Sequence, residues 1–149
     1  MLSLETINDE IKQAMLAKNR VKLETLRSIK KEFLDAKTAK GAADTLSEET
    51  IIAILQKMVK QRKESATIYI SQGRTDLAEV EVEQFNVIEE YLPEQLSPEE
   101  LEKAVKKIIA DVGATSMKEM GKVMGVASKE LAGKAEGKLI SEMVRGLLG

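Results

Sequence analysis

Glycine and lysine alternate through the stretch between Ser116 and Ser141, and this spacing is the clearest chemical signal in the chain. The glycines, separated by four residues or multiples of four, are Gly121, Gly125, Gly133 and Gly137. The lysines among them are Lys118, Lys122, Lys129, Lys134 and Lys138. A glycine inside a helix costs roughly 0.5–1 kcal/mol relative to alanine, so it suits places where the backbone must approach another helix or a ligand. Lysines beside such gaps favour an anionic ligand, and RNA phosphate is the obvious candidate.

A structural interpretation of the same residues stays open beside this one. Gly121 and Gly125 would then only let two helices pack closely, and Gly133 and Gly137 would only supply a turn. Lysines on a helix commonly form nothing more than its solvated face. The candidate RNA-binding residues are Lys118, Lys122, Lys129, Lys134, Lys138, Gly133, Gly137 and Ser141.

The residue types offer little for catalysis. The chain has no cysteine and no histidine, which excludes disulfides, thiol nucleophiles and every serine–histidine or cysteine–histidine pair. Adjacent carboxylates such as Glu89 and Glu90 point about 100° apart on a helix and do not share a site. The phosphate-loop pattern GxxxxGK[ST] is missing as well. We therefore predict no catalytic residue, no metal site and no cofactor.

Charge and composition set further bounds. The net charge of −2 gives no global attraction for nucleic acid, but Lys118 to Arg145 holds six basic and four acidic residues. Two weaker basic clusters contain Lys30, Lys31 and Lys37, and Lys57, Lys60, Arg62 and Lys63. With 43% hydrophobic and 3% aromatic residues, the core must be aliphatic and rich in methionine, as in helix-on-helix packing. Neither a membrane span nor a signal peptide is evident, so we expect no membrane partner and a cytoplasmic location.

Helical periodicity runs through nearly every segment, so the fold class is predicted to be all-α. The first four helices are expected from Ser3 to Met15, from Leu23 towards Gly41, from Ser47 to Gly73, and from a capping box at Asp76 and Glu79 to Tyr91. The pattern near Asn19 fits two separate helices and one continuous helix equally well. Pro93 then interrupts the periodicity and marks a domain boundary.

Three further helices are predicted after this boundary. Ser97, Pro98 and Glu100 form a strong helix start, and that helix ends at Gly113. Ser116 and Glu119 form a second capping box, whose helix ends at Gly133, and a last helix carries Ile140 to Leu148. The domains are thus an N-terminal helical unit, residues 1–93, and a small C-terminal three-helix bundle, residues 96–149.

Motifs over the whole chain resemble a known family. The segments "TSMKEMGKVMG" and "AGKAEGKLISEMV", with "LETLRSIKKEF", "LQKMVKQRKESATIY" and "GRTDLAEVEVEQFNVIEEYLPEQLS", are similar to the YqeY family. They also resemble the tail domain of GatB, the B subunit of the glutamine-dependent Asp/Glu-tRNA amidotransferase. Two positions depart from the pattern, because Lys134 replaces an arginine and Glu136 replaces an aspartate. The lysine loses bidentate phosphate geometry, and the glutamate should cap the last helix less well.

The resemblance implies a non-catalytic helical module that binds tRNA or another structured RNA in connection with tRNA-dependent amidotransfer. Lys138 and Ser141 keep the family's GKxxS positions. A protein–protein adaptor is the alternative, in which adaptable methionines meet a partner protein: Met117, Met120, Met124 and Met143. A structural interpretation instead places all four methionines in the small core. A carbon–nitrogen ligase using glutamine as amido donor is less supported, because the resemblance does not extend to GatB's catalytic domain.

Overall fold

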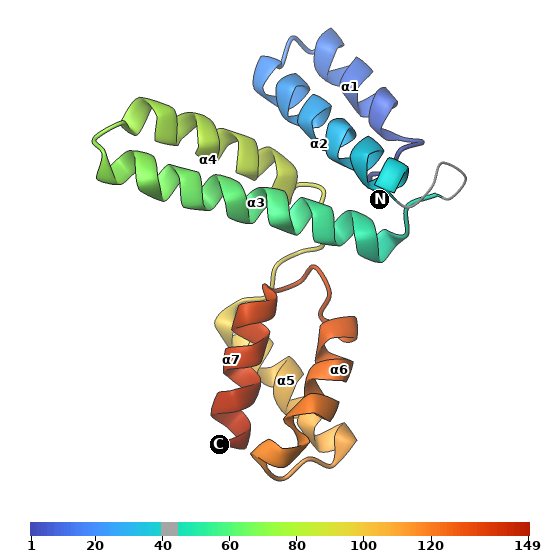
Figure 1. Ribbon diagram of the computed structural model, residues 1–149, viewed down its shortest axis with the longest axis vertical. Coiled ribbons are helices and arrows are strands. Elements are labelled where there is room, and N and C mark those ends of the chain that lie inside the picture. Colours follow the sequence, from blue (N-terminus) through green and yellow to red (C-terminus); the bar gives the residue numbers. More distant parts are fainter. Residues whose placement is uncertain (40–44) are drawn as a thin grey trace. The chain divides into compact units, whose positions relative to one another are not determined.

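The computed structural model describes residues 1–39 and 45–149, and these residues form helices without a single strand (Figure 1). The all-α prediction is therefore confirmed. The chain divides into two compact units, Met1–Leu92 and Pro93–Gly149. The domain bounds expected from the sequence, residues 1–93 and 96–149, stay a prediction. The predicted end of the second helix near Gly41 lies outside the described residues.

The first unit consists of two helical hairpins. Its helices are α1 (Ile7–Leu16), α2 (Arg20–Ala39), α3 (Glu48–Ser71) and α4 (Thr75–Glu89). Figure 1 shows α3 and α4 running antiparallel, and α2 packs against both of them as well as against α1. The largest side chains that are fully buried here are Phe33, Ile7, Leu26, Ile29, Leu55 and Ile88. The core of this unit thus draws on all four helices.

The start of the chain and the α1–α2 connection differ from the predicted pattern. Ser3 and Thr6 bond each other, with Ser3 N donating to Thr6 Oγ1 at 2.9 Å and Thr6 N to Ser3 Oγ at 3.3 Å. This turn delays the regular helix to Ile7, so Ser3 is not its N-cap. Lys18, at φ 55°, separates α1 from α2, and Asn19 Oδ1 accepts from the Lys22 amide at 3.1 Å. The two helices are therefore distinct.

The predicted capping box at the start of α4 is wrong. The N-cap residue is Arg74, and no side chain caps the helix there. Asp76 instead receives the Arg74 guanidinium, with Nη2 at 3.0 Å from Oδ2. The Ser47 cap of α3 is confirmed, because its hydroxyl accepts from the Thr50 amide at 3.2 Å.

The second unit contains three α-helices that pack on one another. They are α5 (Pro98–Val112), α6 (Met120–Glu130) and α7 (Gly137–Leu148), with a short 3₁₀ helix η1 (Met117–Glu119) before α6. Its core is aliphatic and includes Leu101, Val105, Ile108, Val123, Ala127, Ile140 and Val144. All four aromatic residues of the chain lie in the first unit, and residues 93–149 contain none.

The two serine–glutamate pairs of this unit behave differently. Ser97 and Glu100 form the predicted capping box, with Ser97 Oγ accepting at 3.2 Å and Glu100 Oε1 accepting at 3.3 Å. Gly113 ends α5 at φ 76°, a conformation that favours glycine. The predicted box at Ser116 and Glu119 is wrong, because Ser116 makes no side-chain cap bond. Residues 117–119 form the 3₁₀ turn instead, and Glu119 accepts from the Thr115 hydroxyl at 3.4 Å.

Candidate nucleic-acid interface

Helix α6 presents two contrasting faces. Val123 and Ala127 are fully buried in the core of the second unit. Gly121, Lys122, Gly125, Val126 and Lys129 follow one another at steps of one, three, one and three residues, which places them along one stripe of the helix. All of these except half-buried Val126 are exposed. The amphipathic pattern of α6 therefore directs its glycines and lysines away from the core.

The two glycines of this stripe are not needed for packing within the second unit. A Cβ atom built on Gly121 or on Gly125 would meet no atom within 4 Å. Close helix packing, the structural interpretation of these two residues, thus finds no partner helix among the described residues. The space above both glycines is open.

A shallow depression of about 590 Å³ follows the same stripe, and we call it the α6 groove. It is lined by Val112, Gly121, Lys122, Gly125, Val126, Lys129 and Glu130. Val112 comes from the last turn of α5, so two helices form the groove. The sequence pattern flagged its glycines and lysines. Val126 has the same helical spacing and could have been found that way, whereas Val112 could not.

The loop between α6 and α7 is held from outside the two helices. Gly133 is buried and has φ 78°, which favours glycine. Its carbonyl accepts from the side-chain amide of Gln95, and the carbonyl of Lys134 accepts from the Leu96 amide at 2.8 Å. Gly133 therefore shapes the loop, while the Lys134 side chain is exposed. Sequence reasoning missed Gln95, which lies 38 residues from its partner.

The start of α7 carries the remaining candidates. Gly137 and Lys138 are exposed in its first turn, and Ser141 is half-buried. Glu136 occupies the N-cap position but makes no side-chain cap bond, in agreement with its predicted weakness as a cap. The first amides of α7 therefore receive no side-chain acceptor from the cap residue, and exposed lysines lie next to them in the chain.

The five candidate lysines do not form one compact cluster. Lys122 and Lys129 line the α6 groove. Lys134 and Lys138 flank the start of α7, and Lys118 lies in η1, beyond the opposite end of α6. All five are exposed, and no ion pair joins their side chains to any part of the chain that the structure describes.

Basic residues of the first unit are partly engaged in its own packing. Arg62 Nε donates to Gln84 Oε1 at 3.1 Å, and Arg62 Nη1 donates to the Met58 carbonyl at 3.3 Å. Lys63 Nζ lies 3.2 Å from Glu89 Oε1. The contacts with Gln84 and Glu89 join α3 to α4, whereas the Met58 contact lies within α3, so half of the Lys57–Lys63 cluster has a structural role.

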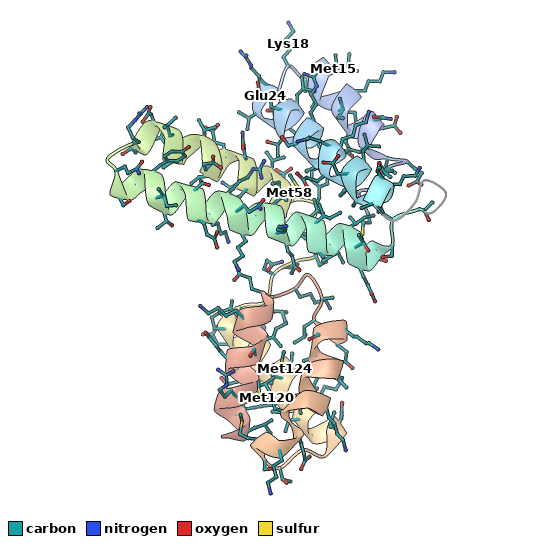
Figure 2. The ribbon with its side chains drawn as sticks, in the orientation of Figure 1. Met15, Lys18, Glu24, Met58, Met120 and Met124 are labelled. Carbon is teal, nitrogen blue, oxygen red and sulfur yellow. The ribbon has the colours of Figure 1, made fainter. Side chains whose placement is uncertain are left out.

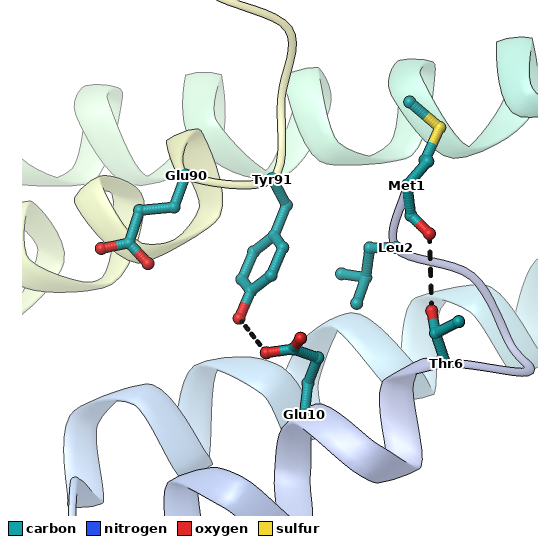
Figure 3. A pocket seen from close by; sticks show the side chains of 6 residues that line it. All are labelled: Met1, Leu2, Thr6, Glu10, Glu90 and Tyr91. Atoms are coloured by element: carbon teal, nitrogen blue, oxygen red, sulfur yellow. Dashed lines mark hydrogen bonds between the residues drawn. The ribbon is translucent and has the colours of Figure 1, made fainter.

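A second cavity, of about 380 Å³, lies in the first unit and is shown in Figure 3. It is lined by Met1, Leu2, Thr6, Glu10, Glu90 and Tyr91. The Tyr91 hydroxyl donates to Glu10 Oε2 at 2.9 Å, and Lys22 Nζ lies 3.7 Å from Glu90 Oε2. Burial, with the bond to Glu10, raises the pKa of Tyr91 above its usual range. The phenol therefore keeps its proton and acts as a tie between α1 and the end of α4.

The methionines of the second unit mostly belong to its core. Met120, Met124 and Met143 are partly buried against the aliphatic cluster, and Figure 2 marks the first two. Met117 is 40% exposed. Of the four methionines offered as an adaptor surface, one is thus free for a partner.

No group of three or more acidic, histidine or cysteine residues suited to a metal ion occurs in residues 1–39 and 45–149. Within the same ranges, no helix combines the length and apolarity that crossing a bilayer requires.

Comparisons with known proteins identify relatives of the whole chain. A family model described as "Yqey-like protein" matches residues 4–148. Several fungal proteins named "Altered inheritance of mitochondria protein 41, mitochondrial" are also similar. The one from Vanderwaltozyma polyspora is 34% identical over 124 residues, covering 76% of this chain and 64% of the relative. The one from Clavispora lusitaniae is 36% identical, covering 60% and 51%. The one from Pyrenophora tritici-repentis is 26% identical, covering 98% and 81%.

These relatives correct one expectation. Each is named as a mitochondrial protein, so the expectation of a cytoplasmic location is wrong by this comparison. The chain spans 64% and 51% of the length of the first two relatives.

Proposed function

This chain belongs to the Yqey-like protein family, and we propose that it is a helical module that binds tRNA or another structured RNA, in connection with tRNA-dependent amidotransfer and without a catalytic centre of its own. The observation that carries the proposal is the start of α7. An N-terminus without a side-chain cap lies there between two exposed lysines, Lys134 and Lys138.

A phosphate group suits this arrangement for two reasons. The first amides of a helix point away from it and, with the helix dipole, favour an anion. Lys134 precedes these amides and Lys138 lies among them, so both ammonium groups can neutralise the same phosphate or its neighbours. Ser141, one turn further along, adds a hydroxyl on the Lys138 side of the helix. Gly133 contributes by holding the loop in shape.

RNA recognition at this surface would depend on shape and phosphate positions. Residues 93–149 contain no aromatic side chain on which a base could stack. Lysine ammonium groups and helix amides bind phosphates, which position a protein but carry no base sequence. A folded RNA displays its phosphates in a defined arrangement, so a structured RNA is the proposed ligand class.

Charge reversal at the two lysines tests the proposal. In Lys134→Glu/Lys138→Glu, we expect weaker binding of bulk tRNA in mobility-shift titrations at several salt concentrations. Each lost phosphate contact should lower the slope of log K against log salt by about one unit or slightly less. Exposed substitutions of this kind should leave the free energy of unfolding within about 0.5 kcal/mol of its original value.

A matched control separates a site from a general charge effect. Lys103 and Lys107 on α5 are also exposed, and neither forms an ion pair with a described residue. Lys103→Glu/Lys107→Glu makes the same change in net charge, so it should keep most of the affinity and the salt slope. Equal losses in both variants would remove the start of α7 as the site. If the unmodified chain fails to retard tRNA even at low salt, the RNA-binding proposal falls.

A protein–protein adaptor remains the second candidate, favoured by the apolar part of the α6 groove. Val112 and Val126 lie in this open depression, and Met117 is exposed just before α6. Cross-linked capture from a lysate, with and without nuclease, separates the two candidates. Partners that remain after nuclease treatment support the adaptor, and partners that disappear support RNA.

A further inference from the structure

Gly121 and Gly125 remain unexplained by the fold and by the proposed site at α7. Each replaces a better helix former inside α6 at a cost of roughly 0.5–1 kcal/mol. Both are exposed, and a Cβ atom at either position would meet nothing within 4 Å. The fold would therefore accept alanine at both positions. Glycine would be favoured at both positions if another molecule binds against this face of α6, because that molecule could then approach the helix backbone closely.

We propose that the α6 groove seats a sugar–phosphate strand of the bound RNA, with the strand lying over Gly121 and Gly125 and between Lys122 and Lys129. The inference rests on the proposed RNA-binding function and extends its surface from α7 to α6. It adds Gly121, Gly125 and the flanking Val126 to the binding residues.

Charge complementarity identifies the occupant. Lys122 and Lys129 are seven residues apart, or about 10 Å along the helix axis on nearly the same side. Both line the groove, and neither is paired within the described ranges. An anionic strand that lies along the α6 groove would contact the Lys122 ammonium group near one end and the Lys129 ammonium group near the other. Glu130 lines the groove next to Lys129 and disfavours a phosphate beyond that end.

The floor of the groove suits a ribose better than a phosphate. Val112 and Val126 offer apolar contacts, while the glycines leave the helix backbone uncovered. A helical carbonyl that accepts one bond within the helix keeps a second lone pair. A ribose 2′-hydroxyl is a donor that could reach it only where no side chain intervenes. Because DNA lacks that hydroxyl, the groove should prefer RNA.

Alanine substitution separates this role from a structural one. We would measure thermal unfolding and the binding of an RNA hairpin and of a DNA hairpin of the same base sequence. In Gly121→Ala/Gly125→Ala, the melting temperature should rise, since alanine favours the helix and the space is open. RNA affinity should fall by about tenfold, equal to about 1.4 kcal/mol, and the preference over DNA should shrink.

Gly146 provides the matched control. It lies in α7, is exposed, and also has open space where a Cβ would be. Gly146→Ala should raise the melting temperature in the same direction and leave RNA affinity unchanged. A gain in stability with a loss of binding, confined to the groove variant, is a combination that a packing role does not produce.

The remaining outcomes each overturn the inference in a distinguishable way. If the unmodified chain binds the RNA hairpin and the groove variant binds it equally well, the inference fails while the RNA-binding function stands. The occupant of the α6 groove would then be a partner helix with acidic side chains and not RNA. If the groove variant loses stability, the glycines serve the fold. If the unmodified chain binds no RNA, this inference falls together with the proposed function.

Discussion

Tyr91 links the two ends of the first unit through one side chain. Its hydroxyl bonds Glu10, 81 residues earlier in the chain, and the Lys22 ammonium lies 5.7 Å from the centre of its ring. Lys22 also approaches Glu90. A half-buried phenol with a carboxylate acceptor makes a stronger bond than two neutral groups would. The contact thus joins α1, α2 and the end of α4.

Removing this hydroxyl should have a measurable and pH-dependent effect. Tyr91→Phe should lower the free energy of unfolding by about 1.5 kcal/mol near pH 7, the lower end of the range for a hydrogen bond to a charged group, because the pair is only half-buried. The pKa of Tyr91 is raised in the folded protein, whereas an unfolded tyrosine ionises near pH 10. Above about pH 10 the folded state therefore binds the extra proton, and stability falls as pH rises. Urea unfolding at several pH values should show this alkaline loss in the unmodified chain and a smaller loss in Tyr91→Phe.

Tyr69 is the control for this effect. It is half-buried like Tyr91, but no described residue bonds its hydroxyl. Tyr69→Phe should leave stability within about 0.5 kcal/mol and retain the alkaline loss. An alkaline loss of the same size in Tyr91→Phe would show that the Glu10 contact does not contribute.

At the scale of the helix, two serines test how far a cap can be read from sequence. Ser97 and Ser116 both precede a glutamate by three residues. Ser97→Ala should cost about 1 kcal/mol, because it removes a capping box that is formed. Ser116→Ala should stay within about 0.5 kcal/mol, because no cap bond is lost. Chemical denaturation of both variants provides the comparison. Equal costs would mean that the 3₁₀ turn before α6 is not the stable conformation.

The same pair shows why some elements were predictable and others were not. A capping box needs an extended serine followed directly by helical residues, and Pro98 enforces that at Ser97. After Ser116 a 3₁₀ turn forms, and Thr115 takes the Glu119 carboxylate. At the start of α4, the Asp76 carboxylate pairs with the Arg74 guanidinium and does not cap the helix. Such competition between neighbouring side chains is decided by geometry that a residue pattern does not contain.

The candidate site was predictable to a similar degree. The spacing of glycines and lysines located the exposed stripe of α6, because a helix places residues three and four apart on one face. The contact of Gln95 with Gly133 spans 38 residues and has no local signal. The open space above Gly121 depends on what neighbouring helices leave uncovered, so it also required the structure.

At the scale of the whole molecule, the segment after Leu92 has two parts. Gln95 and Leu96 bond the α6–α7 loop, whereas Pro93 and Glu94 precede these anchors. Limited proteolysis should therefore cut first between Leu92 and Gln95, ahead of the anchored residues. Gln95→Ala should extend cleavage towards Ser97 by freeing the segment. Resistance of the whole stretch from Leu92 to Ser97 would count against separate units.

The second unit, residues 93–149, contains no aromatic side chain and therefore gives no aromatic signal in the near ultraviolet. Phe33, Tyr69, Phe85 and Tyr91 all lie before Pro93. Intrinsic tyrosine emission and the aromatic circular dichroism bands therefore report on the first unit alone, whatever happens in the second. A single tryptophan introduced into α5, α6 or α7 would be the only fluorophore of its kind in the chain. Tyrosine emission would then report on the first unit and tryptophan emission on the second, within one sample.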